Sequence, residues 1–116
     1  MEIHSIKDFP FDCDIVDITS DFKIEKSSSF AYLDADKVKF PMRLRTWTEG
    51  DFFRPLGMKG NKKVSDFLID QKVSVVAKKT VKVLVQAEEI VWLVGHRISD
   101  KYSVSISTKR VLKLSI

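Results

Sequence analysis

The chain has 116 residues, of which 44% are hydrophobic and 31% charged, with 20 Lys and Arg against 16 Asp and Glu. This length suffices for one domain with a hydrophobic core, and no apolar run approaches the length of a membrane span. The single cysteine, Cys13, excludes an internal disulfide framework and favours a reducing, cytoplasmic location.

Charge is divided unevenly along the chain. Residues 1–36 hold three Lys against nine Asp and Glu, a net charge of −6, whereas residues 37–116 hold 17 Lys and Arg against seven acids, a net charge of +10. Within residues 37–82, 12 Lys and Arg stand against four acids, a net charge of +8. A basic segment of this strength predicts a polyanionic partner. We therefore interpret residues 1–36 as an acidic β segment and residues 37–116 as the basic remainder of a single domain.

Most of the chain is predicted to form short β-strands. Runs rich in β-branched and aromatic residues predict strands at Asp14–Thr19, Phe22–Glu25, Phe30–Leu33, Met42–Trp47, Val81–Gln86, Ile90–Val94, Tyr102–Ser107 and Val111–Ile116. Ala87-Glu88-Glu89 is predicted to be a hairpin connection. The continuously apolar Ile90–Val94 predicts a strand that is covered on both faces. Strands around one helical insert near residues 61–79 predict an α+β, mostly β fold with sandwich-like antiparallel or mixed sheets.

A loop punctuated by Pro55, Gly57 and Gly60 precedes the helical insert. These residues favour special backbone geometry, which is often arranged for close approach to a ligand. A solvated surface turn is the alternative.

The insert itself is predicted to be a helix from Lys62 to about Gln71, with an apolar stripe at i, i+3, i+4 and i+7 formed by Val64, Phe67, Leu68 and Gln71. Asn61 is a suitable N-cap, which sets Lys62 and Lys63 in the first turn. The helix dipole disfavours cations at that end. Two lysines beside free backbone N–H groups are therefore interpreted as a phosphate-binding site.

Strand alternation in Met42–Trp47 sets Arg43, Arg45 and Trp47 on one face. This pattern predicts either a surface that stacks bases and binds phosphate, or a tryptophan that covers the edge of the core. The candidate nucleic-acid-binding residues are the cations of this strand, the loop and the helical insert, together with one later arginine, namely Arg43, Arg45, Arg54, Lys59, Lys62, Lys63, Lys72, Lys78, Lys79 and Arg97.

The sequence offers few catalytic candidates. His4 and His96 stand alone, without a cysteine or carboxylate at metal-ligand spacing, so no zinc site is expected. Asp66 and Asp70 lie one helical turn apart and are interpreted as surface carboxylates. The chain has neither a Ser-His-Asp grouping nor the G-x-x-x-x-G-K-[ST] string of a phosphate-binding loop.

An ordered string of motifs runs through the basic region. It reads R-x-R, G-D-x-F-x-P-L-G-M-x-G and K-K-x-S-D-F-x-I-D-x-K-V, and I-x-W-x-x-G-x-R-I follows. Over roughly Leu33–Ile106, the chain resembles the C-terminal domain of bacterial tRNA(Ile)-lysidine synthetases. The segment Ser74–Val81 departs from that family, because lysines replace arginines and two prolines are missing. This departure argues against a bidentate guanidinium contact there.

The resemblance implies that residues 37–116 are a substrate-recognition domain of an ATP-dependent ligase that joins lysine to the wobble cytidine of an isoleucine tRNA. It implies contact with tRNA, at the acceptor stem, and with the catalytic domain of the same polypeptide. ATP and Mg²⁺ are implied for an N-terminal domain with an S-G-G-x-D-S loop, a string that this chain lacks. We therefore expect this chain to be non-catalytic, to bind no cofactor and to have no membrane partner. The alternative is a protein-interaction module with little RNA contact.

Overall fold

The computed structural model describes all residues, 1–116. The strands are β1 (Glu2–Ile3), β2 (Asp12–Asp17), β3 (Phe30–Asp34), β4 (Met42–Thr46), β5 (Phe52–Phe53), β6 (Lys62–Lys63), β7 (Lys82–Gln86), β8 (Glu89–Leu93), β9 (Arg97–Ile98) and β10 (Arg110–Ser115). The α-helices are α1 (Val64–Asp70) and α2 (Val75–Lys78), and three 3₁₀-helices span Ile6–Asp8, Ala35–Lys37 and Asp100–Tyr102. Neither α-helix is long and apolar enough to cross a membrane.

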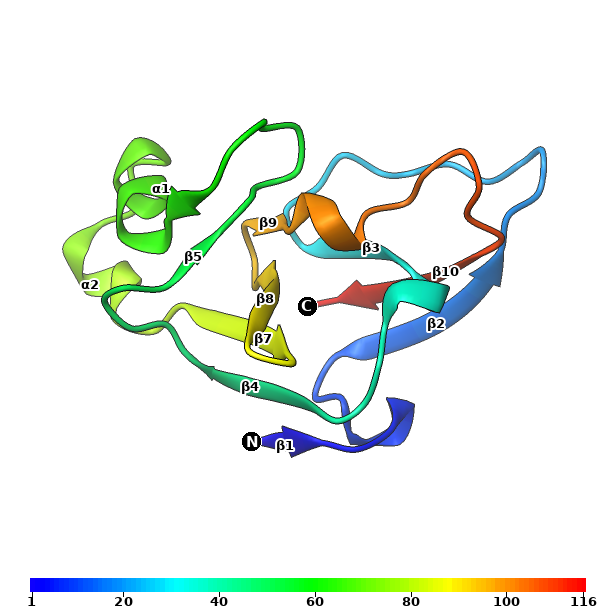
Figure 1. Ribbon diagram of the computed structural model, residues 1–116, viewed down its shortest axis with the longest axis horizontal. Helices are drawn as coiled ribbons and strands as arrows, with labels where there is room; N and C mark the ends of the chain where they lie inside the picture. The colour runs from blue at the N-terminus through cyan, green and yellow to red at the C-terminus, as the bar shows by residue number, and fades with distance from the viewer.

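The strands form three antiparallel sheets. A five-stranded sheet has the order β1-β4-β7-β8-β9, a three-stranded sheet the order β2-β10-β3, and β5 pairs only with β6. In Figure 1 the three-stranded sheet lies to the right of the five-stranded sheet, while α1 and α2 lie at the left end of the long axis. The predicted α+β, mostly β fold with sandwich-like sheets is confirmed, and the helical insert holds two short helices.

The first hydrophobic core fills the space between the two larger sheets. Trp92 of β8 is fully buried there, and Phe11 packs against it edge-on with ring centroids 5.2 Å apart. Leu33 of β3 and Leu112 of β10 face the same core from the three-stranded sheet. Burial of apolar surface from both sheets therefore holds the sandwich together.

The second core lies on the other face of the five-stranded sheet, under α1. Val64, Phe67 and Leu68 are buried there, against Val83 of β7 and Leu93 of β8. Three residues of the predicted helical stripe are thus confirmed as core residues. Gln71, the fourth, is exposed because the helix ends at Asp70, one residue earlier.

Strand β8 separates the two cores, which confirms that it is covered on both faces. Ile90 and Leu93 face the second core, whereas Val91 and Trp92 face the first. Two neighbouring residues share a face because the register with β7 shifts between Leu84 and Val85, which is a β-bulge. The hairpin that joins β7 to β8 is also confirmed, and its two turn residues, Ala87 and Glu88, have φ values of 48° and 67°.

The prediction that Lys62 and Lys63 form the first turn of a helix is wrong. They form β6, which pairs with Phe52 and Phe53 of β5, and α1 begins at Val64 with Lys63 as its N-cap residue. Because Lys63 is the N-cap residue, the N-cap prediction for Asn61 is also wrong, and the side chain of Lys63 makes no capping hydrogen bond. Strand pairing holds the two lysines extended, and the Val64 amide donates to the carbonyl of Asp51 at 2.9 Å.

Two predicted strands do not form. Residues 22–25 are irregular, and the expected Tyr102–Ser107 strand is replaced by a 3₁₀-helix and a loop. In that loop the Thr108 hydroxyl donates to the buried Asp34 carboxylate at 2.8 Å and accepts from the Ser105 amide at 2.8 Å. Side-chain hydrogen bonds of this kind compete with a strand ladder, which is why alternation alone misled the prediction.

Candidate nucleic-acid interface

The most basic part of the structure is the helical layer, defined as residues 54–79, which comprises the loop, β6, α1 and α2. It holds seven Lys and Arg against two Asp, a net charge of +5. In Figure 1 its helices lie at one end of the molecule, at the opposite end of the long axis from much of β2. Strand β2 carries three Asp and no cation. The positive charge of the molecule is therefore concentrated in the helical layer.

The loop at the start of this layer is a defined turn. The Met58 amide donates to the Pro55 carbonyl at 2.9 Å, and Gly57 between them has a φ of +87°. This is the left-handed conformation that the third residue of a type II turn needs, and a side chain at Gly57 would be strained. The Leu56 amide donates to the Ile98 carbonyl at 3.0 Å, which fixes the loop to β9. Gly60 does not have a positive φ, so its backbone conformation does not require a glycine.

Four of the ten candidate residues hold a carboxylate partner. The pairs are Arg43–Glu2 at 2.6 Å, Arg45–Asp51 at 2.8 Å, Arg54–Asp100 at 3.0 Å, and Lys62–Asp70. A phosphate that bound these cations would have to displace or share a carboxylate. They are therefore weaker candidates for direct phosphate contact than an unpaired lysine.

Among these pairs, Arg45–Asp51 is the most enclosed. The guanidinium donates to both carboxylate oxygens, at 2.8 and 2.9 Å, and the Thr48 amide donates to Asp51 at 2.8 Å. Burial raises the pKa of Asp51, but the hydrogen bonds from Arg45 and Thr48 outweigh it and hold this pKa below its ordinary value. The same hydrogen bond raises the pKa of Arg45. The pair fixes the turn between β4 and β5.

The other six candidates have no carboxylate within 4.0 Å, and five of them lie in the helical layer: Lys59, Lys63, Lys72, Lys78 and Lys79. The sixth, Arg97 of β9, is half-buried, with its guanidinium carbon 5.1 Å from the centre of the Phe67 ring.

Trp47 donates its indole N–H to the Lys78 carbonyl at 2.7 Å and packs against the second core. Of the two interpretations of Trp47, covering the core edge is the one that fits this contact.

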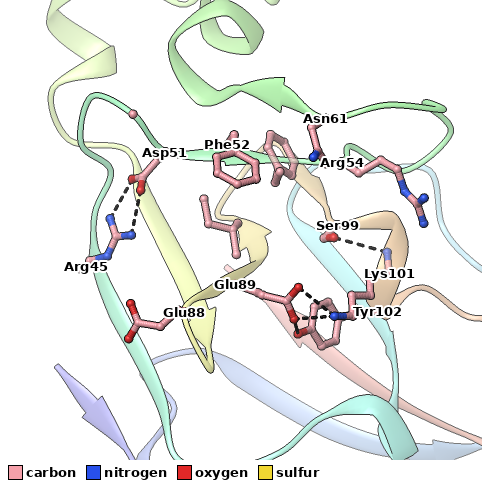
Figure 2. Close-up of a pocket in the computed structure, with 13 residues that line it drawn as sticks. Arg45, Asp51, Phe52, Arg54, Asn61, Glu88, Glu89, Ser99, Lys101 and Tyr102 are labelled. Atoms are coloured by element: carbon pink, nitrogen blue, oxygen red, sulfur yellow. Dashed lines mark hydrogen bonds and ion pairs between the residues drawn. The ribbon is translucent and has the colours of Figure 1, made fainter.

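A cleft of about 350 Å³ opens between the β5–β6 ribbon and the β7–β8 hairpin. We call it the β5–β8 cleft. Figure 2 shows Phe52 and Asn61 at its upper side and Glu88 and Glu89 across from them. Phe52 is 59% exposed, although Phe53 beside it is buried.

The lower wall of the cleft is a hydrogen-bonded cluster. The Glu89 carboxylate accepts from the Lys101 ammonium at 2.6 and 2.8 Å and from the Tyr102 hydroxyl at 3.0 Å (Figure 2). These bonds lower the pKa of Glu89. Burial, together with the neighbouring carboxylate, raises the pKa of Tyr102 to about 12. Lys101 is therefore matched by a carboxylate and adds little free positive charge to the cleft.

Sequence reasoning did not predict this cleft. Its walls come from segments far apart in the chain, around Phe52, Asn61, Glu89 and Lys101, and only their packing brings these together. One signal was available: adjacent residues of a regular strand face opposite sides, so Phe52 and Phe53 could not both pack into the same core.

Comparison with known proteins places the chain in a family. The sequence model described as the TilS substrate C-terminal domain matches residues 42–114. The chain belongs to this family. It is 52% identical over 95 residues to a tRNA(Ile)-lysidine synthase of Parabacteroides distasonis, a match that covers 82% of this chain and 22% of the relative. It is 41% identical over 96 residues to one of Bacteroides thetaiotaomicron, covering 83% of this chain and 22% of the relative. The chain thus spans about a fifth of the length of these curated relatives.

Solved structures share the fold. A crystal structure of a TilS C-terminal domain superposes with a TM-score of 0.74 at 20% identity, covering 90% of this chain and 80% of the other. An N-terminal fragment of the Pyrococcus horikoshii phenylalanyl-tRNA synthetase β-subunit superposes with a TM-score of 0.61 at 21% identity, covering 72% of this chain and 26% of the other. All ten candidate residues lie within the matched TilS segment, whereas β1, β2 and β3 precede it.

Proposed function

We propose that this chain is the tRNA-binding, non-catalytic domain of a ligase that converts the wobble cytidine of an isoleucine tRNA to lysidine with ATP. Family membership and the names of the relatives support the parent reaction. The unpaired lysines of the helical layer support the other part of the proposal, which is that the chain binds RNA. Five cations of this layer have no carboxylate partner, so a phosphate that binds them does not have to displace one.

The acceptor stem is the part of the tRNA that we propose for this surface. A-form RNA is recognised mainly through its phosphates, 2′-hydroxyls and shape, because its deep groove is closed to side chains. Lysines suit that task, since a point charge can follow a phosphate without the fixed fork of an arginine. Lys72, Lys78 and Lys79 lie at or beside the ends of α1 and α2, where their side chains are free to do so.

ATP and Mg²⁺ are proposed to act in another domain of the parent protein, since an S-G-G-x-D-S string is absent from this sequence. We propose a cytoplasmic location on the grounds of the single, unpaired Cys13. The catalytic domain of the same polypeptide is the other proposed partner.

The test is the salt dependence of binding to three RNAs: the isoleucine tRNA, its acceptor-stem minihelix, and an unrelated tRNA. If about three to five phosphates are neutralised, log K falls with log salt at a slope of roughly −2 to −4. The minihelix is expected to bind about as tightly as the whole tRNA. A slope near zero would contradict RNA binding, and a minihelix that fails to bind would contradict the acceptor stem alone.

A second candidate function is docking of another protein surface, and one observation favours it. Ile69 of α1 and Val75 and Val76 of α2 are exposed, the two valines by 72% and 78%. Neighbouring exposed apolar side chains often mark protein contacts. Changing both valines to serine separates the two candidates. Loss of co-elution with the catalytic domain at unchanged tRNA affinity supports docking, and unchanged co-elution contradicts it.

A further inference from the structure

We infer that the β5–β8 cleft binds an unstacked nucleobase that carries an exocyclic amino group, taken from a single-stranded RNA end. This inference rests on the proposed function, because it assigns to the same RNA a second contact besides the phosphates. It starts from Phe52, which has no aromatic neighbour and is 59% exposed. An exposed ring at the side of a cleft offers a stacking platform for a base.

The size and charge of the cleft suit a base rather than a phosphate. Its volume of about 350 Å³ lies within the range of small-molecule sites, roughly 300–1,000 Å³. Its three cations are each held by a carboxylate, in the pairs Arg45–Asp51, Arg54–Asp100 and Lys101–Glu89. A phosphate would meet no unpaired cation there, whereas a neutral base requires none.

Hydrogen-bonding groups without a partner indicate which bases fit. The side chain of Asn61 makes no hydrogen bond within the protein, and Glu88 has no cation within 4.0 Å. Carboxylates accept hydrogen bonds and cannot donate them when ionised, so this wall matches a base with an exocyclic amino group, such as cytosine or adenine. Uracil would present carbonyl oxygens to the same wall, which is unfavourable. An amide at Asn61 both donates and accepts, and it complements either base.

The position of the cleft connects it to the lysine surface. Arg54 and Asn61, which line the cleft, are also the two ends of the loop that carries Lys59. The cleft therefore adjoins the loop of the lysine surface, and a duplex that lies on the helical layer and extends past this loop reaches the cleft. A single-stranded extension beside the duplex is the part whose bases are free to leave the stack.

The experiment measures binding of tetracytidylate and tetrauridylate to the 116-residue chain, by NMR titration of backbone amide shifts. Wild type is expected to bind tetracytidylate more tightly, with shifts at Phe52, Asn61 and Glu89. Phe52→Ala should weaken tetracytidylate binding about tenfold, as expected for loss of base stacking on an aromatic ring. Ile69→Ala is the matched control, because Ile69 has the same exposed fraction, 59%, outside the cleft. It should leave the affinity unchanged.

Glu88→Ala should abolish the preference for cytosine over uracil while keeping the stacking contribution. Equal binding of the two tetranucleotides by wild type overturns the amino-group assignment. Equal losses for Phe52→Ala and Ile69→Ala overturn the cleft as the site. The proposed function is judged separately with an acceptor-stem minihelix trimmed to a blunt-ended duplex, which has no single-stranded end and which Phe52→Ala should bind like wild type. If the minihelix binds but the tetranucleotides do not respond to Phe52→Ala, the cleft inference fails and the proposed function stands.

Discussion

The cations of this domain fall into two regions that the sequence does not distinguish. Around the β5–β8 cleft, Arg45, Lys101 and Arg54, the first residue of the helical layer, each face a carboxylate; we call these three ion pairs the paired corner. In the helical layer, most lysines have no such partner. The helical layer holds seven Lys and Arg against two Asp, and it is the region that offers uncompensated positive charge. Basic composition therefore predicts a polyanionic partner, whereas ion pairing within the fold decides which cations are free to bind it.

The largest expected effect tests what holds the helical layer in place. Phe67 is 2% exposed and packs edge-on against Phe53 with ring centroids 5.4 Å apart. Phe67→Ala should lower the free energy of unfolding by about 3–5 kcal/mol, through lost burial and the cavity left behind. Denaturant titration followed by tryptophan fluorescence measures this. Exposed Ile69→Ala, on the same helix, should change it by less than about 0.5 kcal/mol. A loss below about 1 kcal/mol for Phe67→Ala would contradict the second core.

The next effect separates free from paired cations. Changing Lys63, Lys72 and Lys79 together to glutamine should weaken tRNA binding by about tenfold or more at moderate salt, and flatten the salt slope by roughly 2–3 units. The melting temperature should hardly change, because none of the three has an ion-pair partner.

The matched control for this variant changes Lys7, Lys23 and Lys109 to glutamine. It removes the same charge from outside the helical layer. Similar losses in both triple variants would mean that net charge alone attracts the RNA, and that the helical layer is not its site.

A smaller effect is expected in the paired corner. Arg45→Ala leaves the Asp51 carboxylate, whose side chain is 13% exposed, without its bidentate partner. Losing a charged hydrogen bond of this kind should cost about 1–3 kcal/mol of stability. The tRNA affinity of folded protein should stay within about twofold of wild type. Arg43→Ala is the control, since its pair with Glu2 is exposed and contributes little to stability. If Arg45→Ala melts like wild type and binds tRNA weakly, Arg45 is a contact residue after all.

The smallest effect is a titration. The pKa of Tyr102 is raised to about 12, so the fold favours its neutral form, buried and donating to Glu89. Its stabilising contribution is therefore complete below about pH 10, the ordinary pKa, and is lost as the pH rises through 12. Ultraviolet absorbance at alkaline pH should show one late phenolate transition, which Tyr102→Phe removes. A Tyr102 that ionises near pH 10 would contradict the hydrogen-bonded wall of the cleft.

Patterns local in the chain determined much of this protein. Helical spacing predicted the burial of Val64, Phe67 and Leu68, and an unbroken apolar run predicted the two-sided burial of β8, because both patterns can be recognised within one segment of the chain. The unequal division of charge and the family motif were likewise properties of the sequence alone.

Only the tertiary structure decided the rest. Lys62 and Lys63 became a strand because Phe52 and Phe53 supplied its ladder, and a partner ten residues away outweighs local helix signals. Ion pairs such as Arg54–Asp100 join residues 46 positions apart, so no window of sequence reveals which cation is neutralised. The β5–β8 cleft exists for the same reason, since its walls belong to separate segments that meet only when the two cores form against β8.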